Sequence, residues 1–200
     1  MKFKLVGIGE VLWDVYPDAA HFGGAPANFA CHAASLGAAA WMVSAVGADD
    51  LGERALAKLR EHGVDCDHIS RDEHHATGRV LVTLNKSGQP AYEFAADPAW
   101  DHLTWSDELS VLAEGCDAVC FGTLSQRSSA SRETIRRFIS ATPATALRVF
   151  DVNPPSAILR HGNDPHLAPT RLRRETKRRG IAHCRRTLRA ARSDATRNGN

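Results

Sequence analysis

Short apolar runs alternate with amphipathic segments along most of this chain. Apolar runs of this length, bounded by Gly, Pro or Asp, predict strands buried in a sheet. Segments with apolar residues three and four positions apart predict helices that cover such a sheet. Alternating strands and helices indicate an α/β fold with a parallel sheet and right-handed crossovers. The predicted strands are residues 4–13, 41–46, 64–69, 117–122 and 147–153, and the predicted helices are residues 26–36, 50–62, 106–114 and 131–139.

One segment has a different pattern, in which apolar and polar positions alternate. Val80 and Val82 fall on one face of this segment and Leu81 on the other, which is the pattern of a half-exposed strand. A turn at residues 85–88 separates it from a second short apolar stretch. The pattern predicts a β-hairpin over residues 77–94, inserted between α/β units. The spacing of these residues is equally consistent with a lid over a ligand and with an antiparallel edge of the main sheet.

The ends of the predicted helices carry turn and capping signals. Gly37 and Gly63 follow two of the helices, and glycine suits the left-handed backbone of a C-cap. Asp50, with Glu53 three residues later, is typical of a capping box at the start of the second helix. Ser106 starts the third helix, where acidic residues in the first turn stabilise the positive end of the helix dipole.

The stretch Gly23-Gly24-Ala25-Pro26-Ala27-Asn28 has the composition of a ligand-binding helix start. Its glycines let the backbone turn tightly and approach a ligand closely. Pro26 suits the first turn of a helix, and Asn28 offers both a donor and an acceptor to a polyol. Asp14 lies at the end of the first strand, where ligand-binding groups gather in open α/β sheets. Taken alone, Asp14 also fits a solvated turn acid near Pro17.

Other residues that can carry chemistry have simpler interpretations. The pair Gly7-x-Gly9 lacks the third glycine of a dinucleotide fingerprint. His74 and His75 lie in a polar loop without partners at metal-binding spacing, so we expect them to be solvated. The five cysteines form no CxxC pair and indicate reduced thiols. Cys116 and Cys120 are expected to be buried as small hydrophobic residues.

Charge divides the 200-residue chain at about residue 155. Residues 1–155 hold 13 Lys and Arg against 20 Asp and Glu, a net charge of −7. Residues 156–200 hold 12 against 3, a net charge of +9, and all 13 aromatic residues lie before this basic segment. Because it has almost no large apolar residues to form a core, the basic segment is predicted to be disordered.

Composition also bears on location. Residues 1–4 lead into a short apolar run without a cleavage-like site, and no apolar run approaches the length of a membrane span. Together with the reduced thiols, these features predict a cytoplasmic protein with no membrane partner. A hydrophobic content of 43% is sufficient for one globular domain.

Several motifs, taken in order, resemble those of the PfkB (ribokinase-like) carbohydrate kinases, and the Gly23–Asn28 stretch is most similar to fructokinase-like members. The resemblance covers about residues 3–155. It implies a ribokinase-like fold, in which a parallel sheet is flanked by helices and carries a small β lid made of the hairpin and an extension of the first strand. The motifs are Gly7-Ile-Gly-Glu10, Asp14, Gly23-Gly-Ala-Pro-Ala-Asn28, Leu36-Gly37, Val46-Gly-x-Asp-x-x-Gly52 and Asp151-x-Asn153.

The resemblance also implies a function and a set of site residues. Kinases of this family transfer the γ-phosphoryl group of ATP, with Mg²⁺, to a hydroxyl of a sugar such as fructose. Asp14 would bind two sugar hydroxyls, Asn153 would lie near the nucleotide phosphates and Mg²⁺, and the lid would support a homodimer. The implied sugar-binding residues are Asp14, Gly23, Gly24, Asn28, Gln126 and Arg127.

The resemblance stops at about residue 155, where Pro154-Pro155 lead into the basic segment. In this family the catalytic base and anion hole come from a late D-T-x-G-A-G-D-like motif, and none of the 200 residues matches it. No catalytic residue and no metal ligand is therefore assigned in this chain. We expect a carbohydrate kinase homologue, truncated after about residue 155, with absent or impaired phosphotransferase activity. A shift of reading frame or a fragmentary gene product would explain the abrupt change in residue composition after about residue 155.

Two other functions remain open from the sequence. A non-catalytic sugar-binding module would keep Asp14 and Asn28 and bind a sugar without turnover. A polyanion-binding protein would act through residues 156–200. The lack of aromatic residues among these arginines argues against nucleic acid as the partner. Salt-sensitive RNA binding that is lost on truncation at Pro155 would support the polyanion-binding hypothesis.

Overall fold

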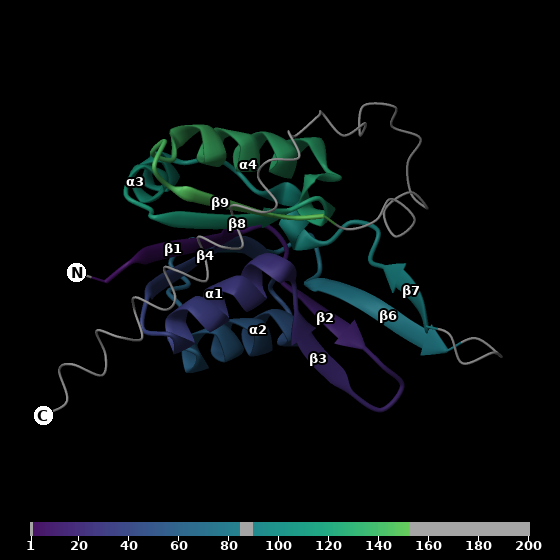
Figure 1. Cartoon of the computed structure of the whole chain (residues 1–200). Coiled ribbons are helices and arrows are strands. Elements are labelled where there is room, and N and C mark those ends of the chain that lie inside the picture. Colours follow the sequence, from purple (N-terminus) through teal and green to yellow (C-terminus); the bar gives the residue numbers. More distant parts are fainter. Residues whose placement is uncertain (1, 85–89, 153–200) are drawn as a thin grey trace, which may run out of the picture.

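A parallel five-stranded sheet forms the centre of the computed structural model, which describes residues 2–84 and 90–152 (Figure 1). Every neighbouring pair of strands in this sheet is parallel. The strand order is β5-β4-β1-β8-β9, so the first strand lies in the middle. The strands are β1 (Lys4–Ile8), β4 (Ala39–Gly47), β5 (Ile69–Asp72), β8 (Ala118–Gly122) and β9 (Leu147–Asp151).

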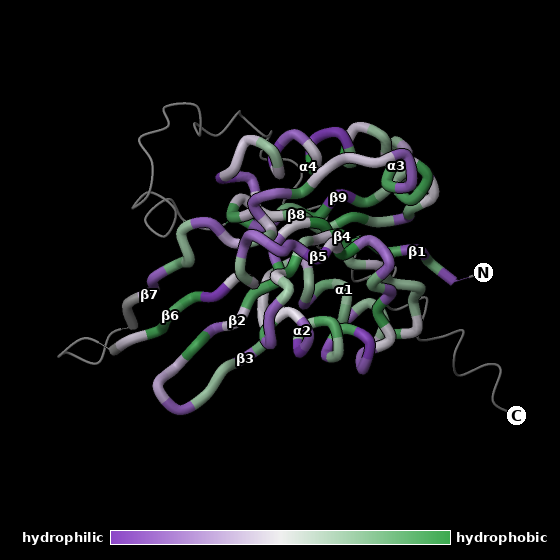
Figure 2. Tube along the Cα trace, turned by 180° about the vertical axis from the view of Figure 1, so that it is seen from behind, coloured by the Kyte–Doolittle hydropathy of each residue, from purple (hydrophilic) through white to green (hydrophobic). Residues whose placement is uncertain are grey.

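Helices cover both faces of the central sheet, which confirms the predicted α/β architecture. Helices α1 and α2 lie on one face and α3 and α4 on the other (Figures 1 and 2). Two 3₁₀ turns precede the helices α3 and α4: η1 (Ala99–His102) lies before α3, and η2 (Leu124–Gln126) lies before α4. No helix in the described part of the chain is long and apolar enough to span a membrane. The helices are α1 (Ala25–Ser35), α2 (Asp50–Glu61), α3 (Asp107–Glu114) and α4 (Ser129–Ala141).

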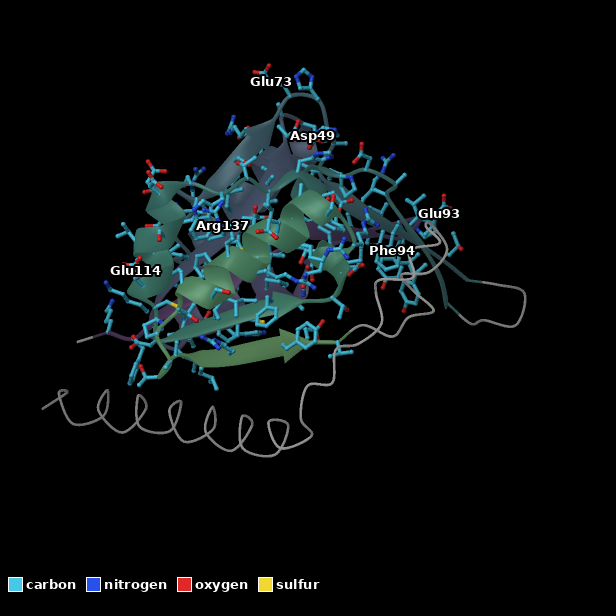
Figure 3. All side chains as sticks on the ribbon, turned by 90° about the horizontal axis from the view of Figure 1, so that it is seen from above. Asp49, Glu73, Glu93, Phe94, Glu114 and Arg137 are labelled. Atoms are coloured by element: carbon cyan, nitrogen blue, oxygen red, sulfur yellow. The ribbon has the colours of Figure 1, made fainter. Side chains whose placement is uncertain are left out.

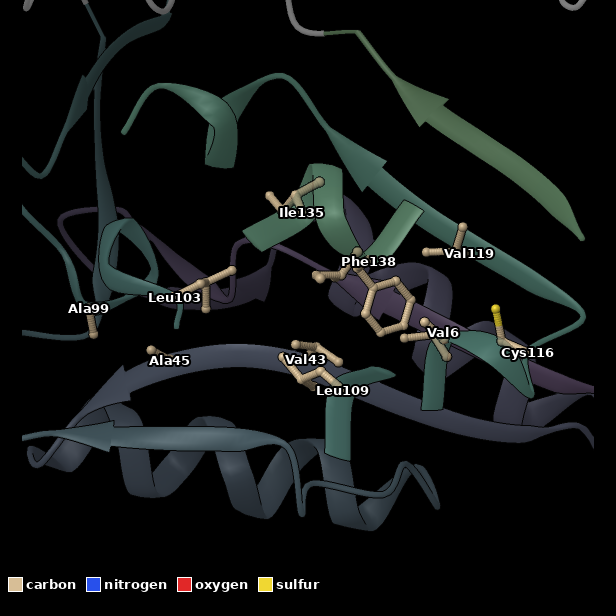
Figure 4. Packing of buried hydrophobic residues seen from close by; sticks show 12 residues of the cluster. Val6, Val43, Ala45, Ala99, Leu103, Leu109, Cys116, Val119, Ile135 and Phe138 are labelled. Atoms are coloured by element: carbon tan, nitrogen blue, oxygen red, sulfur yellow. The ribbon is translucent and has the colours of Figure 1, made fainter. Parts of the chain in front are cut away.

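The central strands are apolar on both faces because each face contributes to a separate core. Val43 of β4 packs with Val6 and with Phe138 of α4 in one core, which Figure 4 shows from close by. Met42, the preceding residue of β4, packs with Ala27 and Ala30 of α1 in the other core. A continuous apolar run is therefore the pattern expected of these strands.

The alanine-rich sequence of α1 lets this helix approach the sheet closely. Ala27, Ala30 and Ala33 are buried. A Cβ atom on Gly7 of β1 would overlap the carbonyl oxygen of Pro26. Only glycine fits where the first turn of α1 crosses β1, and this contact positions the start of the helix relative to the sheet.

A second sheet of four strands, called the lid below, lies beside the central sheet (Figure 1). Its strand order is β3-β2-β6-β7, and β2 and β6 pair in parallel. The hairpin predicted at residues 77–94 therefore belongs to this second sheet and is not an edge of the main sheet. The lid strands are β2 (Leu12–Val15), β3 (Ala20–Gly23), β6 (Gly78–Leu84) and β7 (Pro90–Phe94).

Three predictions about element boundaries are wrong. The single strand predicted at residues 4–13 is two strands in different sheets, because the chain turns at Gly9, whose φ is +137°. The strand predicted at 64–69 begins only at Ile69, and the preceding residues contribute one isolated bridge, from Asp65 to Trp41.

The third correction concerns the cap of α2, which is Asp49 and not Asp50. Asp49 has an extended backbone, and its Oδ1 accepts a hydrogen bond from Gly52 N at 2.8 Å. The same carboxylate accepts hydrogen bonds from the backbone N and the hydroxyl of Thr77, at 2.8 and 2.7 Å. Asp49 thus caps the helix and anchors the chain one residue before β6 begins, whereas Asp50 is exposed in the first turn.

Candidate functional site

A cleft of about 280 Å³ lies between the lid and the carboxyl ends of the central strands. Ligands bind outside the carboxyl ends of the strands in open α/β sheets. The wall combines three carboxylates with apolar and aromatic side chains, a composition suited to a small polar ligand that also has an apolar face. The lining residues are Glu10, Leu12, Asp14, Gly24, Ala25, Val80, Tyr92, Phe94, Leu124 and Asp151.

The strand pairing of the lid brings three of its cleft-lining residues into one row. Asp14 of β2 is paired with Val80 of β6, and Val80 is paired with Phe94 of β7. Paired residues point to the same face of a sheet, so the carboxylate, the valine and the aromatic ring share the inner face of the lid. Figure 3 shows Phe94 on this part of the molecule.

Asp14 is half-buried in the cleft, and its pKa differs from that of an exposed acid. Burial raises the pKa of Asp14, and the nearby His21 partly offsets this effect. A Cβ atom on Gly23 would lie 3.2 Å from Asp14 Oδ2. Glycine at position 23 therefore leaves room around the carboxylate, as expected for a residue that accepts hydrogen bonds from a ligand.

Gly24 connects the lid to α1 and brings the start of that helix to the cleft wall. Its φ is +110°, a region that residues with a side chain rarely adopt. A Cβ atom at this position would also overlap the carbonyl oxygen of Glu10. Both observations require glycine, and Gly24 and Ala25 line the cleft.

Glu10 lines the cleft but was not among the sugar-binding residues predicted from the sequence. It lies between β1 and β2 and is 1% exposed. Its Oε2 atom has no hydrogen-bond partner among the described residues. The pKa of Glu10 is raised to about 7, mainly by burial and to a smaller extent by the Asp151 carboxylate, although backbone groups and the Ser125 side chain act in the opposite direction. The signal that could have found it is an acidic residue within an otherwise apolar run.

Among the predicted sugar-binding residues, Asp14 and Gly24 line the cleft and Gly23 lies beside Asp14, whereas two others lie apart from the cleft. Asn28 is exposed on α1 and does not line the cleft. The Gln126 amide donates a hydrogen bond to the carbonyl oxygen of Gly122 at 2.8 Å. Sugar contacts by these two side chains stay predictions.

Arg127, a third predicted sugar ligand, is engaged by other residues. Its Nη2 donates to Asp101 Oδ2 at 2.7 Å and to the carbonyl oxygen of Ala95 at 2.8 Å. The guanidinium also lies 4.4 Å from the ring centroid of Trp100. A role for Arg127 at the sugar also stays a prediction. Asn153 and residues 156–200 lie outside the described residues.

A second cleft, of about 340 Å³, lies at the other end of the central sheet. It is larger but is lined by residues near the amino ends of strands, including Lys4 and Trp41. Ligand-binding groups gather at the opposite, carboxyl ends in this class of fold. The cleft under the lid is therefore the stronger candidate for the functional site.

A parallel α/β sheet with a β lid over a carboxylate-lined cleft defines a class of small-molecule-binding domain to which sugar kinases belong. The profile described as "pfkB family carbohydrate kinase" matches residues 18–153. The chain belongs to this family of carbohydrate kinases. Glu10 and Asp14 lie just before the matched residues.

Individual relatives agree with the family assignment. The chain is 34% identical over 175 residues to the ATP-dependent 6-phosphofructokinase of Thermoanaerobacterium thermosaccharolyticum, covering 82% of this chain and 53% of the relative. It is 34% identical over 120 residues to the fructokinase of Escherichia coli, covering 58% of this chain and 39% of the relative. The chain thus spans about half the length, or less, of these curated relatives.

Solved structures confirm the fold. A sugar kinase from Pyrococcus horikoshii superposes with a TM-score of 0.69 at 30% identity, covering 78% of this chain and 55% of that one. The fructokinase from Xylella fastidiosa superposes with a TM-score of 0.69 at 26% identity, covering 82% of this chain and 55% of that one. The predicted ribokinase-like architecture, a parallel sheet flanked by helices, is therefore confirmed.

Proposed function

We propose that this chain provides the sugar-binding part of an ATP-dependent carbohydrate kinase and that its acceptor is a sugar of the fructose class. Residues 1–155 would form this kinase part and residues 156–200 a separate basic segment. The observation that carries the proposal is the Asp14 carboxylate, which lies in a cleft under the lid with Gly23 leaving room beside it. The proposed cytoplasmic location is supported by the odd number of cysteines, five, and by the free thiols of Cys31, Cys66, Cys116 and Cys120.

The chemistry of the cleft fits a sugar. The Asp14 carboxylate can accept hydrogen bonds from two neighbouring hydroxyl groups, and hydrogen bonds to a charged group are stronger than those to a neutral one. Glu10, with a pKa of about 7, can be protonated near neutral pH and then donates a hydrogen bond as well as accepting one. Phe94 and Val80 present apolar surface that packs against the C–H groups of a sugar and excludes water.

The proposed phosphoryl donor is ATP, with Mg²⁺ as the metal ion, because the chain belongs to this kinase family. The Xylella fastidiosa fructokinase has been solved with bound ATP. In the present chain the Asp151 carboxylate, at the end of β9, lines the cleft and is the type of oxygen ligand that Mg²⁺ prefers. Mg²⁺ bound near Asp151 would offset the charge of the ATP phosphates during transfer.

Isothermal titration of the purified 200-residue chain tests the proposal. We expect fructose to bind, and Asp14→Ala to weaken its binding by at least ~100-fold, because two charge-assisted hydrogen bonds of about 1.5–3 kcal/mol each are lost. Asp18→Ala is the matched control, since Asp18 is an exposed acid in the adjacent β2–β3 turn. Fructose 6-phosphate, titrated in parallel, identifies the preferred acceptor.

Two results would contradict the proposal: equal affinity in Asp14→Ala and wild type, or no binding of either sugar. A coupled assay with ATP and Mg²⁺ then measures transfer. Because the 200 residues contain no match to the late D-T-x-G-A-G-D-like motif, we expect binding without turnover from this chain. Turnover would show that a carboxylate elsewhere in the chain serves as base.

We also propose that two copies associate through the lid. Leu81, on the outer face of β6, is 38% exposed, whereas its neighbours Val80 and Val82 are buried. Burial of this apolar side chain against a second copy would favour association. Size-exclusion chromatography with light scattering is expected to show a dimer for the wild type and mostly monomer for Leu81→Lys. Thr83→Lys, which adds the same charge on the same face of β6, is the comparison variant. A wild-type monomer at every concentration would contradict this.

A further inference from the structure

Two histidines and an aspartate from separate segments meet at the base of the lid. His75 lies three residues before β6 begins, Asp97 lies three residues after β7 ends, and His102 is the last residue of η1. His102 Nε2 is 2.7 Å from Asp97 Oδ1, and His75 Nε2 is 3.5 Å from Asp97 Oδ2. The two imidazole rings are stacked, with centroids 3.6 Å apart and an interplanar angle of 17°.

Each of the three side chains offers one ligand atom, and because the two rings are stacked and nearly parallel, the binding of one ion by both histidines requires a rotation of at least one ring. A nitrogen of each histidine and an oxygen of Asp97 all lie within 4.8 Å of one another. His75 and His102 are partly buried, and Asp97 is exposed to solvent. Water would supply the remaining ligand of a bound tetrahedral ion.

A fourth residue, Asp72, fixes the orientation of His75. Asp72 Oδ2 lies 2.8 Å from His75 Nδ1. Asp72 Oδ1 accepts hydrogen bonds from the backbone N of His74 and of His75, at 2.8 and 3.0 Å, and these bonds hold the carboxylate in place. A carboxylate on Nδ1 places the proton there and leaves Nε2 with a free lone pair, as is typical of metal-binding histidines.

We propose that His75, Asp97 and His102 bind a divalent transition metal ion of the zinc type, with Asp72 as the residue that orients His75. Two imidazole nitrogens and one carboxylate oxygen suit Zn²⁺, Co²⁺ or Ni²⁺. Mg²⁺ and Ca²⁺ prefer ligand sets made of oxygen alone. None of the four residues lines the cleft under the lid, so this site is independent of the proposed sugar site.

A metal ion at this position would cross-link the two chain segments that lead into and out of the β6–β7 hairpin. One backbone hydrogen bond, from Ala99 N to the carbonyl oxygen of Ala76 at 2.9 Å, already joins these segments. An ion that binds the folded state alone stabilises it in proportion to the logarithm of its concentration. We therefore expect Zn²⁺ to raise the melting temperature of the wild-type chain.

Titration of the untagged, full-length chain with Co²⁺ tests the site, because the absorption spectrum reports the ligand type. We expect one equivalent to bind with weak d–d bands and no thiolate-to-cobalt charge-transfer band. His75→Ala and His102→Ala are each expected to weaken binding at least ~10-fold, and Asp72→Asn by ~10–100-fold, through loss of orientation. His74→Ala is the matched control, because His74 is an exposed histidine of the same loop and is expected to bind Co²⁺ as wild type does.

Three results of this titration would contradict the proposed site. The first is an equal affinity for Co²⁺ in His75→Ala, His102→Ala and wild type, and the second is a loss of affinity in His74→Ala as large as that in His75→Ala. The third is a thiolate-to-cobalt charge-transfer band. Circular dichroism without metal checks that each variant is folded. If an alanine variant is not folded, His75→Gln or His102→Gln takes its place. The rise in melting temperature with Zn²⁺ must disappear in the same variants.

Discussion

At pH 8 the Glu10→Gln variant is expected to have a free energy of unfolding up to about 3 kcal/mol higher than wild type, since a shift of one pKa unit corresponds to 1.36 kcal/mol. Burial of Glu10 raises its pKa from the ordinary value of 4.5 to about 7. At pH 8 the wild-type protein must therefore keep a charged carboxylate at a buried position. Glutamine has nearly the same shape, carries no charge, and avoids this cost.

The difference in the free energy of unfolding between Glu10→Gln and wild type is expected to depend on pH. A carboxyl group with a raised pKa in the folded state favours folding when it is protonated. Its contribution is complete below the unfolded pKa of about 4.5 and is lost as the pH rises through the folded pKa of about 7. The difference between Glu10→Gln and wild type should thus be small at pH 5, grow through pH 6 and 7, and level off by pH 8.

Urea unfolding at pH 5, 6, 7 and 8 measures this difference. Glu73→Gln serves as the control, because Glu73 is exposed in the loop before His74 (Figure 3). We expect its difference from wild type to stay flat over the same range. If Glu10→Gln also gave a flat difference, the Glu10 carboxylate would be compensated in the folded protein, and its role as a titrating group of the cleft would be lost.

Loss of the Asp101 charge is expected to have the largest destabilising effect. The Asp101 side chain is 7% exposed and pairs with Arg127, whose Nε and Nη2 lie 2.9 and 2.7 Å from Asp101 Oδ2. Removal of one partner of a buried pair leaves the other charge without compensation and costs about 3–5 kcal/mol. Asp101→Asn should therefore lower the free energy of unfolding by that amount, as measured in urea.

A double-mutant cycle separates the lost pair from other effects of the substitution. The pKa of Asp101 is raised, mainly by burial, in spite of the Arg127 guanidinium, so we expect the pair itself to add little net stability. Asp101→Asn with Arg127→Met should then recover much of the loss seen in Asp101→Asn. Lys58→Met, which breaks an exposed pair with Glu61, should leave stability almost unchanged. An additive double mutant would show that the two charges act independently.

The parts of this fold that depend on local sequence were predictable. Gly37 and Gly63 end helices with φ values of +89° and +77°, and Ser106 caps α3, because these features depend on the chain within a few residues. The cap of α2 was misplaced by one residue because Asp49 and Asp50 are chemically alike. Only the backbone conformation, fixed in part by the distant Thr77, selects Asp49.

The parts that depend on long-range contacts could not be derived from spacing. The expectation that His75 is solvated is wrong, because His75 is partly buried, pairs with Asp72, and meets Asp97 and His102, from which the lid hairpin separates it in the sequence. Arg127 was predicted to bind sugar only through the resemblance to fructokinase-like kinases, and the contacts of its guanidinium with Asp101 and Trp100 could not be read from the sequence. A single sequence does not specify which distant residues become neighbours.

The pairing of β2 with β6 has a consequence for the order of folding. Asp14 and its partner Val80 are 66 residues apart in the chain, whereas α1 packs on β1 and β4, its near neighbours in sequence. Contacts that close such a long loop cost more chain entropy and form more slowly than local ones. We therefore expect the cleft to assemble after the contacts of α1 with β1 and β4 during refolding. A newly made chain would acquire its binding surface only after this local part of its core had formed.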